Sequence, residues 1–485
     1  MIDSLRDERL KKLNNIIGAG INPYPAKSKR THEISEALDK FSALSRQAKK
    51  VTIAGRIMSI RGQGGISFID LKDESGSMQA VAKKDTFKDL EFWRDNLDIG
   101  DFIEAAGPLF KTKRGEKSVD VKSIRILSKS LRPIPSEYYG VHEIETRLRK
   151  RYLDILTNPE TKELFYKKAA FWSETRRALE DAGFLEVETP VLESVPGGAE
   201  AEPFITHHNA LDQDFYLRIS PELNLKRLMV AGYEKVFEIG RIFRNEGISA
   251  EHLQDYTAME MYWAYENYED LMKFVEKLVK RVIKKTFGTL TLEHNGKKVN
   301  WNKKWPRLDY YQLFKKATGI DLKVATHDEL MKKAIDLKIK IESGLGRGRL
   351  IDLIYKKTVR PKLIEPSFLI NTPVDVEPLA KRMPDDPNRV ERFQIVAYGT
   401  ELGKGFSELN DPLDQRKRFE EQMALREKGD KEAQMLDEDY LEAMEYGMPP
   451  TAGFGFGMER TFSVLVGEPV RETVIFPLMR SKKHD

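Results

Sequence analysis

The stretch 235–262 constrains the fold of this chain more than any other. It begins with KVFEI and ends with TAMEMY, and in both runs apolar residues alternate with polar or charged ones. Such alternation predicts two half-buried antiparallel strands joined by a polar loop. Residues two apart on a strand share a face, so Arg244 and Glu246 should point together, as should Glu260 and Tyr262.

The side chains of this hairpin suit the binding of a nucleotide. Arg244 offers a forked pair of donors to a phosphate or carboxylate. Glu246 is an acceptor for an adenine amine, Tyr256 offers a ring face for stacking, and His252 lies in the loop where a polyphosphate tail would run. A plain hairpin whose surface charges pair only with one another is the alternative that this stretch alone leaves open.

Composition narrows the class of protein. The 485 residues are 40% hydrophobic and 33% charged, which predicts a globular chain of two or three domains. The net charge is only +4, from 81 basic and 77 acidic residues, so any RNA-binding surface must be local. Cysteine is absent, which excludes disulfides and thiolate metal sites and leaves carboxylates as the expected metal ligands.

The amino-terminal residues are charged throughout. They lack the apolar run of a signal peptide, and no run of about 18 apolar residues occurs anywhere, so we expect no membrane span and a cytoplasmic protein. Residues 4–18 carry apolar side chains at helical spacing and predict one amphipathic helix rich in Arg and Lys. Its polar face either is solvated or contacts RNA, and the sequence leaves both open.

Residues 51–127 consist of five short strand-like runs separated by glycine turns, with a helical insert around 85–94. This pattern predicts an oligonucleotide-binding (OB) barrel, a fold that binds unpaired bases with aromatic and polar side chains. Phe68 and Gln79 lie on adjacent predicted strands, Arg61 precedes the glycine turn, and Glu116 lies on a later turn. On pattern alone, Phe68 is more typical of a core residue.

The proline-containing segment 131–135 predicts a linker between two domains. We expect a helix and barrel domain over 1–142 and an α+β domain over 143–485, with an insertion around 291–362. The second domain opens with predicted helices over 147–155 and 160–182 and a strand over 184–191 that is interrupted at Pro190.

Towards the carboxyl end, RFQIVAYGTELGKGFSELNDP predicts two strands that carry Gln394, Glu401, Phe406 and Glu408, followed by a charged helix over 412–428. The run PPTAGFGFGMER comes next, and its glycines let the backbone approach a nucleotide closely, while Arg460 begins a helix. A glycine run alone is weak evidence, because it often reflects only tight packing.

Together these stretches resemble the class II aminoacyl-tRNA synthetases, and among them the lysyl-tRNA synthetases most. FRNEG followed by His252, Tyr256 and Glu260 resembles motif 2, and the glycine run ending at Arg460 resembles motif 3. The helix and strand over 160–190 resemble motif 1, which builds a dimer interface, and PFITHHN matches the lysyl family. The resemblance implies an antiparallel catalytic sheet flanked by helices, in a homodimer.

The resemblance also implies an activity: ATP-dependent activation of L-lysine and its transfer to the 3′ end of tRNA(Lys). Arg244 and Arg460 are then the catalytic residues. The other implied roles are ATP binding by Arg244, Glu246, His252, Tyr256, Gly457 and Arg460; Mg²⁺ binding by Glu401 and Gln394; lysine binding by Gly198, Glu222, Glu260, Tyr262, Lys404, Phe406 and Glu408; and anticodon binding by Arg61, Phe68, Gln79 and Glu116.

Three positions depart from the family pattern. Gln394 stands where a metal-binding glutamate is common, which puts the number of magnesium ions in question. Lys404 replaces an asparagine near the substrate carboxylate, where a cation can still pair with that carboxylate. Leu253 replaces an asparagine of the motif 2 loop.

Two rival functions remain at this point. A sister enzyme for aspartate or asparagine has the same architecture, but an aspartate pocket needs a cation, whereas Glu222 and Glu408 are two anions. An RNA-binding or regulatory protein on an inactive synthetase scaffold is the other rival, and the presence of Arg244, Glu246, Glu401 and Arg460 argues against it.

Overall fold

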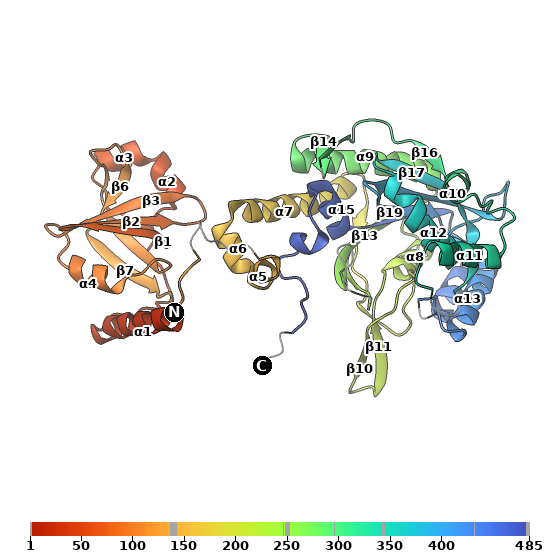
Figure 1. The fold of residues 1–485 in the computed structure, drawn as a ribbon, viewed down its shortest axis with the longest axis horizontal. Coiled ribbons are helices and arrows are strands. Elements are labelled where there is room, and N and C mark those ends of the chain that lie inside the picture. Colours follow the sequence, from red (N-terminus) through yellow and green to blue (C-terminus); the bar gives the residue numbers. More distant parts are fainter. Residues whose placement is uncertain are drawn as a thin grey trace. The chain divides into compact units, whose positions relative to one another are not determined.

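The computed structural model describes residues 2–135, 143–245, 247, 253–294, 296–341, 345–430 and 432–481. The chain forms two compact units, Met1–Val141 and His142–Asp485 (Figure 1). None of the helices in the described ranges is long and apolar enough to cross a membrane.

The amino-terminal unit is built on one sheet with the strand order β5-β6-β3-β2-β1-β4-β7. Its strands are β1 (Val51–Gln63), β2 (Ile66–Lys72), β3 (Ser77–Lys83), β4 (Phe102–Gly107), β5 (Leu109–Lys111), β6 (Lys117–Asp120) and β7 (Ser123–Ser128). All five expected runs form strands, and the last two runs are each divided in two. The division follows from a close crossing, because a Cβ on Gly107 would lie 1.8 Å from the carbonyl oxygen of Asp120.

Four helices accompany this sheet: α1 (Ile2–Gly18), α2 (Ile34–Asp39), α3 (Phe41–Arg46) and α4 (Leu90–Asn96). Strand β2 has the two-residue period of a half-buried strand. Ile69 and Leu71 point into the hydrophobic core of the unit, whereas Phe68 and Asp70 lie on the partly exposed face. Phe68 is therefore not a core residue, although its sequence pattern alone favoured that interpretation.

The carboxyl-terminal unit contains an eight-stranded, mainly antiparallel sheet in the order β16-β17-β18-β19-β20-β13-β12-β8. Its strands are β8 (Leu185–Glu186), β12 (Lys235–Phe243), β13 (Asp255–Ala264), β16 (Arg307–Asp309), β17 (Ser367–Pro373), β18 (Arg389–Ala397), β19 (Thr400–Ser407) and β20 (Thr451–Gly457). The predicted hairpin is β12 with β13, which pair from Lys235 with Trp263 to Phe243 with Asp255.

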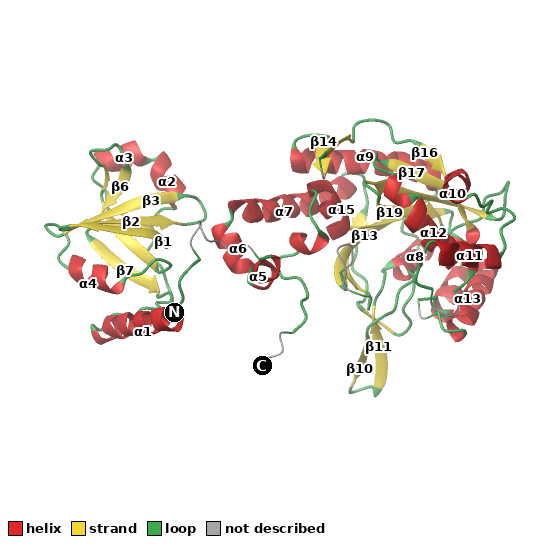
Figure 2. Ribbon diagram, in the orientation of Figure 1, coloured by secondary structure: helices red, strands yellow, loops and turns green. Residues whose placement is uncertain are grey.

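The two faces of this sheet have different compositions. Phe454 and Phe456 of β20 and Met259 of β13 point into the core, which α7 (Pro159–Glu180), α9 (Tyr268–Phe287) and α15 (Met458–Val466) complete (Figure 2). The residues between them, such as Gly455 and Glu260, line a cavity on the opposite face. One face of the sheet thus anchors the unit and leaves the other face available for polar side chains.

The remaining elements surround this sheet. They comprise a three-stranded sheet of β9 (Leu192–Glu193), β10 (Ile205–His208) and β11 (Gln213–Leu217); a hairpin of β14 (Thr291–His294) and β15 (Lys297–Asn300); the helices α5 (Ile144–Arg149), α6 (Arg151–Thr157), α8 (Glu222–Val230), α10 (Tyr310–Thr318), α11 (His327–Asp336), α12 (Arg347–Thr358), α13 (Pro412–Glu427) and α14 (Glu438–Glu445); and the 3₁₀ turns η1 (Arg360–Lys362), η2 (Val374–Val376) and η3 (Val470–Thr473).

Two expected elements differ from the prediction. The strand expected over 184–191 is only β8, because the chain leaves the sheet before Pro190 and Thr189 bonds instead to the carboxylate of Glu238. The helix expected over 147–155 is divided into α5 and α6 at Lys150, whose φ and ψ of −116° and 45° are not helical. The segment 291–362 supplies strand β16 at the edge of the central sheet and three helices.

Candidate active site

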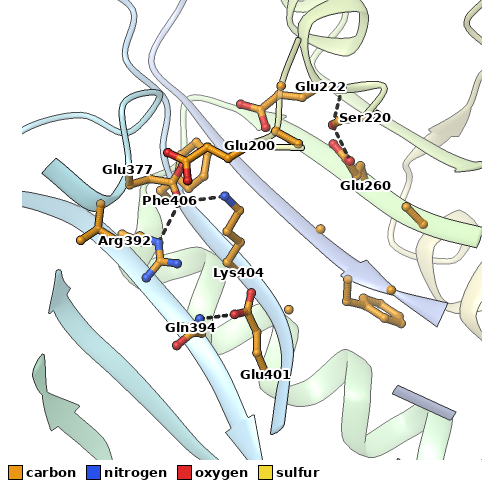
Figure 3. Close-up of a pocket in the computed structure, with 18 of the residues that line it drawn as sticks. Glu200, Ser220, Glu222, Glu260, Glu377, Arg392, Gln394, Glu401, Lys404 and Phe406 are labelled. Atoms are coloured by element: carbon orange, nitrogen blue, oxygen red, sulfur yellow. Dashed lines mark hydrogen bonds and ion pairs between the residues drawn. The ribbon is translucent and has the colours of Figure 1, made fainter. Parts of the chain in front are cut away.

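A cavity of about 510 Å³ lies on the polar face of the central sheet, and α12 closes one of its sides. It brings together all the described residues for which the sequence predicted a role in binding ATP, lysine or metal (Figure 3). They are Gly198, Glu222, Arg244, Tyr256, Glu260, Tyr262, Gln394, Glu401, Lys404, Phe406, Glu408, Gly457 and Arg460. Glu246 and His252 lie outside the described residues.

Three glycines of β20 make room for this cavity. Gly453, Gly455 and Gly457 alternate with the core phenylalanines, so all three face the cavity. A Cβ on Gly453 would lie 2.1 Å from Oε1 of Glu408 and 2.6 Å from a ring carbon of Tyr262. The glycine pattern, which is weak evidence in the sequence, thus reflects the close approach of side chains from β13 and of Glu408, which directly follows β19.

Glu222, Phe406 and Glu408 form one end of the cavity, which we call the floor. Glu222 is the first residue of α8, where the helix dipole favours a negative charge. Both carboxylates are almost fully buried, and neither oxygen of Glu408 has a hydrogen-bond partner among the described residues. Oε2 is ion-paired with Lys226, and Oε1 lies beside Gly453, which faces the cavity. A buried acceptor without a donor is costly, so this oxygen marks the place where a ligand's donor group fits.

Lys226 lies behind the floor, and no role was predicted for it from the sequence. Its Nζ atom is 2.5 Å from Oε1 of Glu222 and is also paired with Oε2 of Glu408. Burial alone would lower the pKa of Lys226, but the two glutamates hold it well above its usual value. Burial raises the pKa of Glu408 well above its usual value, against the pull of Lys226.

Glu260 lies beside the floor and is held by two hydroxyl groups. Ser220 Oγ donates to Oε1 at 2.8 Å and Tyr262 Oη donates to Oε2 at 3.2 Å. Ser220 also accepts from the backbone N–H of Glu222, so one serine couples Glu260 to the start of α8. Burial, reinforced by the charge of Glu222, raises the pKa of Glu260 to about 7.

The residues predicted to bind ATP occupy the opposite end of the cavity. The guanidinium carbon of Arg244 is 5.6 Å from the centre of the Tyr256 ring, a cation–π distance. A Cβ on Gly457 would lie 3.5 Å from the same ring, so the glycine leaves its face open. Arg460, in the first turn of α15, also lines this end. The arrangement has the aromatic face and the cations that a nucleotide requires.

Gln394 and Glu401 lie together on neighbouring strands. The amide Nε2 of Gln394 donates to Oε2 of Glu401, and the hydroxyl of buried Tyr355 is 3.1 Å from the amide oxygen of Gln394. The amide oxygen of Gln394 is therefore already hydrogen-bonded to Tyr355, and Glu401 is the member of this pair with a carboxylate that could bind a metal ion. Within the described ranges, no cluster of three or more His, Asp or Glu side chains that would hold a metal is found. One carboxylate fits Mg²⁺ only where substrate phosphates complete the ligand set.

Lys404 is not a free cation in the cavity. Its Nζ atom is 2.8 Å from Oε2 of Glu377, a carboxylate that also accepts from Nε of Arg392 at 3.0 Å (Figure 3). The two cations hold the pKa of Glu377 below its usual value despite its burial. Two positive groups on one carboxylate leave one net positive charge, which suits an anionic part of a ligand.

The residues predicted to bind the anticodon lie on the amino-terminal unit. Arg61 pairs across β1 and β2 with Phe68, and Asp70 of β2 pairs with Gln79 of β3. Arg61 donates to Oδ2 of Asp70 at 3.0 Å, so Asp70, which the sequence analysis missed, orients the arginine on the same face. Glu116 is exposed in the turn between β5 and β6.

Other residues of the cavity were also missed. Glu377 and Arg392 gave no signal, because their partner Lys404 is distant in sequence from Glu377 and only the fold joins them. Glu200 lines the cavity opposite Arg349 of α12, and burial raises its pKa to about 7. The spacing of Glu222 and Lys226, four residues apart, was a usable signal for an ion pair on a helix.

A methyl group on the floor should exclude the substrate side chain. Gly453→Ala places a Cβ against Glu408 and Tyr262, at a cost of about 1–3 kcal/mol, which is roughly 5- to 150-fold. We expect the KM for lysine to rise by that factor in the lysine-dependent exchange of pyrophosphate into ATP, with little change in the KM for ATP. Gly18→Ala, where a Cβ meets nothing within 4 Å, is the control and should change neither.

The pKa of Glu260 should appear in the pH profile of kcat/KM for lysine. Its carboxylate form accepts an ammonium group and its protonated form does not, so kcat/KM should fall as the pH drops through about 7. Glu260→Gln should remove this step. Glu200→Gln is the matched control, because its pKa is also raised to about 7, and should retain the step. A profile unchanged by Glu260→Gln would contradict the assignment.

Comparisons with known proteins agree with this geometry. Residues 143–480 match the family of class II tRNA synthetases (D, K and N), and residues 51–127 match the OB-fold nucleic acid binding domain. Among similar proteins, the lysine–tRNA ligases of Carboxydothermus hydrogenoformans and Bacillus subtilis are 44% and 41% identical to the chain. The alignments cover 99% of both chains for the first, and 98% of this chain and 97% of the relative for the second. The resemblance and fold class predicted from the sequence are confirmed: the chain belongs to the class II tRNA synthetases, with an amino-terminal OB-fold domain.

Proposed function

We propose that this chain activates L-lysine with ATP to form lysyl-adenylate and then transfers lysine to the 3′ end of tRNA(Lys). Among the observations that support the proposal, the floor of the cavity carries most weight. It presents two buried carboxylates, Glu222 and Glu408, beside the ring of Phe406, and the cavity-side oxygen of Glu408, Oε1, lacks a hydrogen-bond donor among the described residues. An ammonium group on an apolar stem supplies that donor and packs its stem on the ring.

The rest of the cavity fits the other groups of the amino acid. Glu260, beside the floor, accepts from the α-ammonium group. The backbone at Gly198 also lines the cavity, and its φ of 83° is a conformation that favours glycine, whose lack of a side chain lets the backbone approach the substrate. The positive network of Lys404, Arg392 and Glu377 faces the α-carboxylate. Cationic and anionic ends of the substrate therefore meet opposite charges along the cavity.

The first chemical step needs no nucleophile from the protein. An oxygen of the lysine carboxylate attacks the α-phosphorus of ATP, a C–O–P linkage forms, the bond to the β-phosphate oxygen breaks, and pyrophosphate leaves. Arg244 holds both anions in line and offsets their repulsion, while Tyr256 and Arg460 fix the adenine ring between them. Positioning and charge stabilisation are the contributions of the chain itself.

Glu401 is the residue that would hold a magnesium ion, with the phosphates of ATP as further ligands. When bound, Mg²⁺ supplies neutralisation of the phosphate oxygens. Gln394 restrains Glu401 through its amide hydrogen bond, and Tyr355 restrains Gln394. We propose one ion at Glu401, because the oxygen of Gln394 is already engaged.

The second step joins the acyl group to tRNA. The oxygen of a hydroxyl group of the terminal ribose attacks the acyl carbon and loses its proton to solvent. The bond between the acyl carbon and the phosphate oxygen breaks, and AMP leaves. The face of Arg61, Phe68 and Gln79 binds the unpaired anticodon bases by stacking and hydrogen bonds, with Glu116 at its margin. The amino-terminal unit thus supplies tRNA affinity and the other unit supplies the chemistry.

We also propose that the enzyme works as a homodimer in the cytoplasm. Four large apolar side chains have 39–63% of their surface exposed, which favours burial against a second copy. They are Leu185 in the motif 1 segment, Val191 and Leu192 just after it, and Ile205 of β10. The molar mass of the chain in solution, measured by light scattering, tests this assembly.

Exchange of labelled pyrophosphate into ATP, run with each of the twenty amino acids, tests the proposed function. Lysine alone should support rapid exchange. Exchange that depends on aspartate or asparagine would assign the chain to a sister specificity, and absence of exchange with every amino acid would indicate an inactive scaffold.

Removal of the Phe68 ring should weaken tRNA binding and leave activation of the amino acid intact. Stacking on an aromatic side chain contributes roughly 1–3 kcal/mol per base, so Phe68→Ala should raise the KM for tRNA in charging by about 5- to 150-fold. Tyr24→Ala removes an exposed ring of the same unit that belongs to none of these strands, and it should change the KM for tRNA little. Equal effects of the two variants on the KM for tRNA would exclude this face as the anticodon-binding surface.

A further inference from the structure

Lys226 contacts the same side chains that the proposed function assigns to the substrate. Its Nζ atom is 2.5 Å from Glu222, is paired with Glu408, and lies 5.5 Å from the centre of the Phe406 ring. The side chain is fully buried behind the floor and does not line the cavity. It arises from α8, one helical turn after Glu222, so the backbone fixes where its ammonium lies.

The negative groups of the floor outnumber its positive groups. Two carboxylates and one ammonium give a net charge of −1 when all three are ionised. Two buried carboxylates without compensation do not both stay ionised, so the floor requires one more positive group in addition to Lys226. Burial raises the pKa of Glu408 well above its usual value, against the pull of Lys226, which is the direction expected of a carboxylate that lacks full compensation.

The oxygens show the same asymmetry. Lys226 is ion-paired with Oε1 of Glu222 and Oε2 of Glu408, whereas Oε1 of Glu408 lies beside Gly453 on the cavity side. Neither oxygen of Glu408 has a hydrogen-bond partner among the described residues. Lys226 therefore orients Glu408 from behind and leaves one oxygen for the cavity.

We infer that Lys226 is a positioning residue that sets the specificity of the floor: it neutralises one of the two carboxylates and orients Glu408, so that the cavity takes up a single ammonium group. The inference rests on the proposed function and extends it to a residue outside the cavity. Lys226 does not touch the substrate, and its effect passes through the charge of Glu222 and Glu408.

Charge compensation separates this role from a merely structural one. Lys226→Met leaves two buried carboxylates without their cation, and Glu222→Gln leaves Lys226 and Glu408 as a closed neutral pair. The double variant Lys226→Met/Glu222→Gln restores a net charge of −1 on Glu408 alone. If the ion pair only stabilised the fold, lysine binding in the double variant would be impaired at least as much as in either single variant.

The test measures the KM for lysine and the KM for ATP in pyrophosphate exchange with the full-length chain and these variants. Each single variant should raise the KM for lysine about tenfold or more, and the double variant should lower it again, below either single variant. The KM for ATP should stay within about twofold throughout, because the nucleotide binds at the other end of the cavity. Lys226→Arg, which keeps the charge, should be milder than Lys226→Met.

A double variant as impaired as the product of the two single effects would overturn the inference, as would an unchanged KM for lysine in Lys226→Met. If Lys226→Met does not fold, the comparison of Glu222→Gln with the double variant still decides, because compensation requires the double variant to bind lysine more tightly. Lack of lysine-dependent exchange in the unmodified chain would instead refute the proposed function, whatever the variants do.

Discussion

Buried charge is the constraint on which the catalytic cavity depends. Glu222 and Glu408 are withdrawn from water at its floor, where an uncompensated carboxylate is expensive. Lys226 compensates one of them from behind, and the cavity must receive a cation in front to compensate the other. The same rule operates at the opposite sign beside the floor, where Arg392 and Lys404 surround Glu377 and keep one net positive charge. The proposed preference of the cavity for a dipolar amino acid with a second ammonium group rests on these two imbalances.

The central sheet makes such a cavity possible by separating its two faces. On β20, Phe454 and Phe456 join the core against α7, α9 and α15, while the intervening glycines leave space for side chains from β13 and β19. A two-residue period thus assigns stability to one face and chemistry to the other. These positions favour glycine because Glu408, Tyr262 and Glu260 already occupy the volume that a larger side chain would need.

Much of this arrangement was predictable from the sequence, because it depends on local patterns. Alternation located the hairpin of β12 and β13, the five runs of the amino-terminal sheet and the strands that carry Gln394 and Glu401. Glu408, which was expected on the second of these strands, lies directly after β19 and forms an isolated bridge with Ala380. The motif resemblance placed the described candidate residues of the site, and the structure gathers them in one cavity, although their individual roles stay predictions. The strand after α7 was overestimated, because an apolar run does not reveal that Thr189 bonds to Glu238 and leaves the sheet.

The partners of those residues were not predictable in the same way. Glu377 and Lys404 are 27 positions apart and are joined only by the fold, so a lone substitution such as Lys404 gave no indication of its counter-ion. Tyr355 and Gln394 meet across 39 positions, and that contact decides which atom of the amide faces Glu401. Lys226 was within reach of pattern reasoning, yet a lysine on a helix is usually a solvated surface charge.

The charge of the floor, rather than its length, should therefore choose the substrate. Ornithine keeps the ammonium group and lacks one methylene, which costs about 1–3 kcal/mol, so its kcat/KM in pyrophosphate exchange should be roughly 10- to 200-fold below that of lysine. Norleucine keeps the length and lacks the charge, so it leaves Oε1 of Glu408 without a donor and the floor with one uncompensated negative charge, and it should be discriminated against far more strongly than ornithine. The kcat/KM values of lysine, ornithine and norleucine, compared on the unmodified chain, measure this directly. Norleucine accepted as readily as ornithine would contradict the account, because the two buried glutamates would then not form the side-chain pocket.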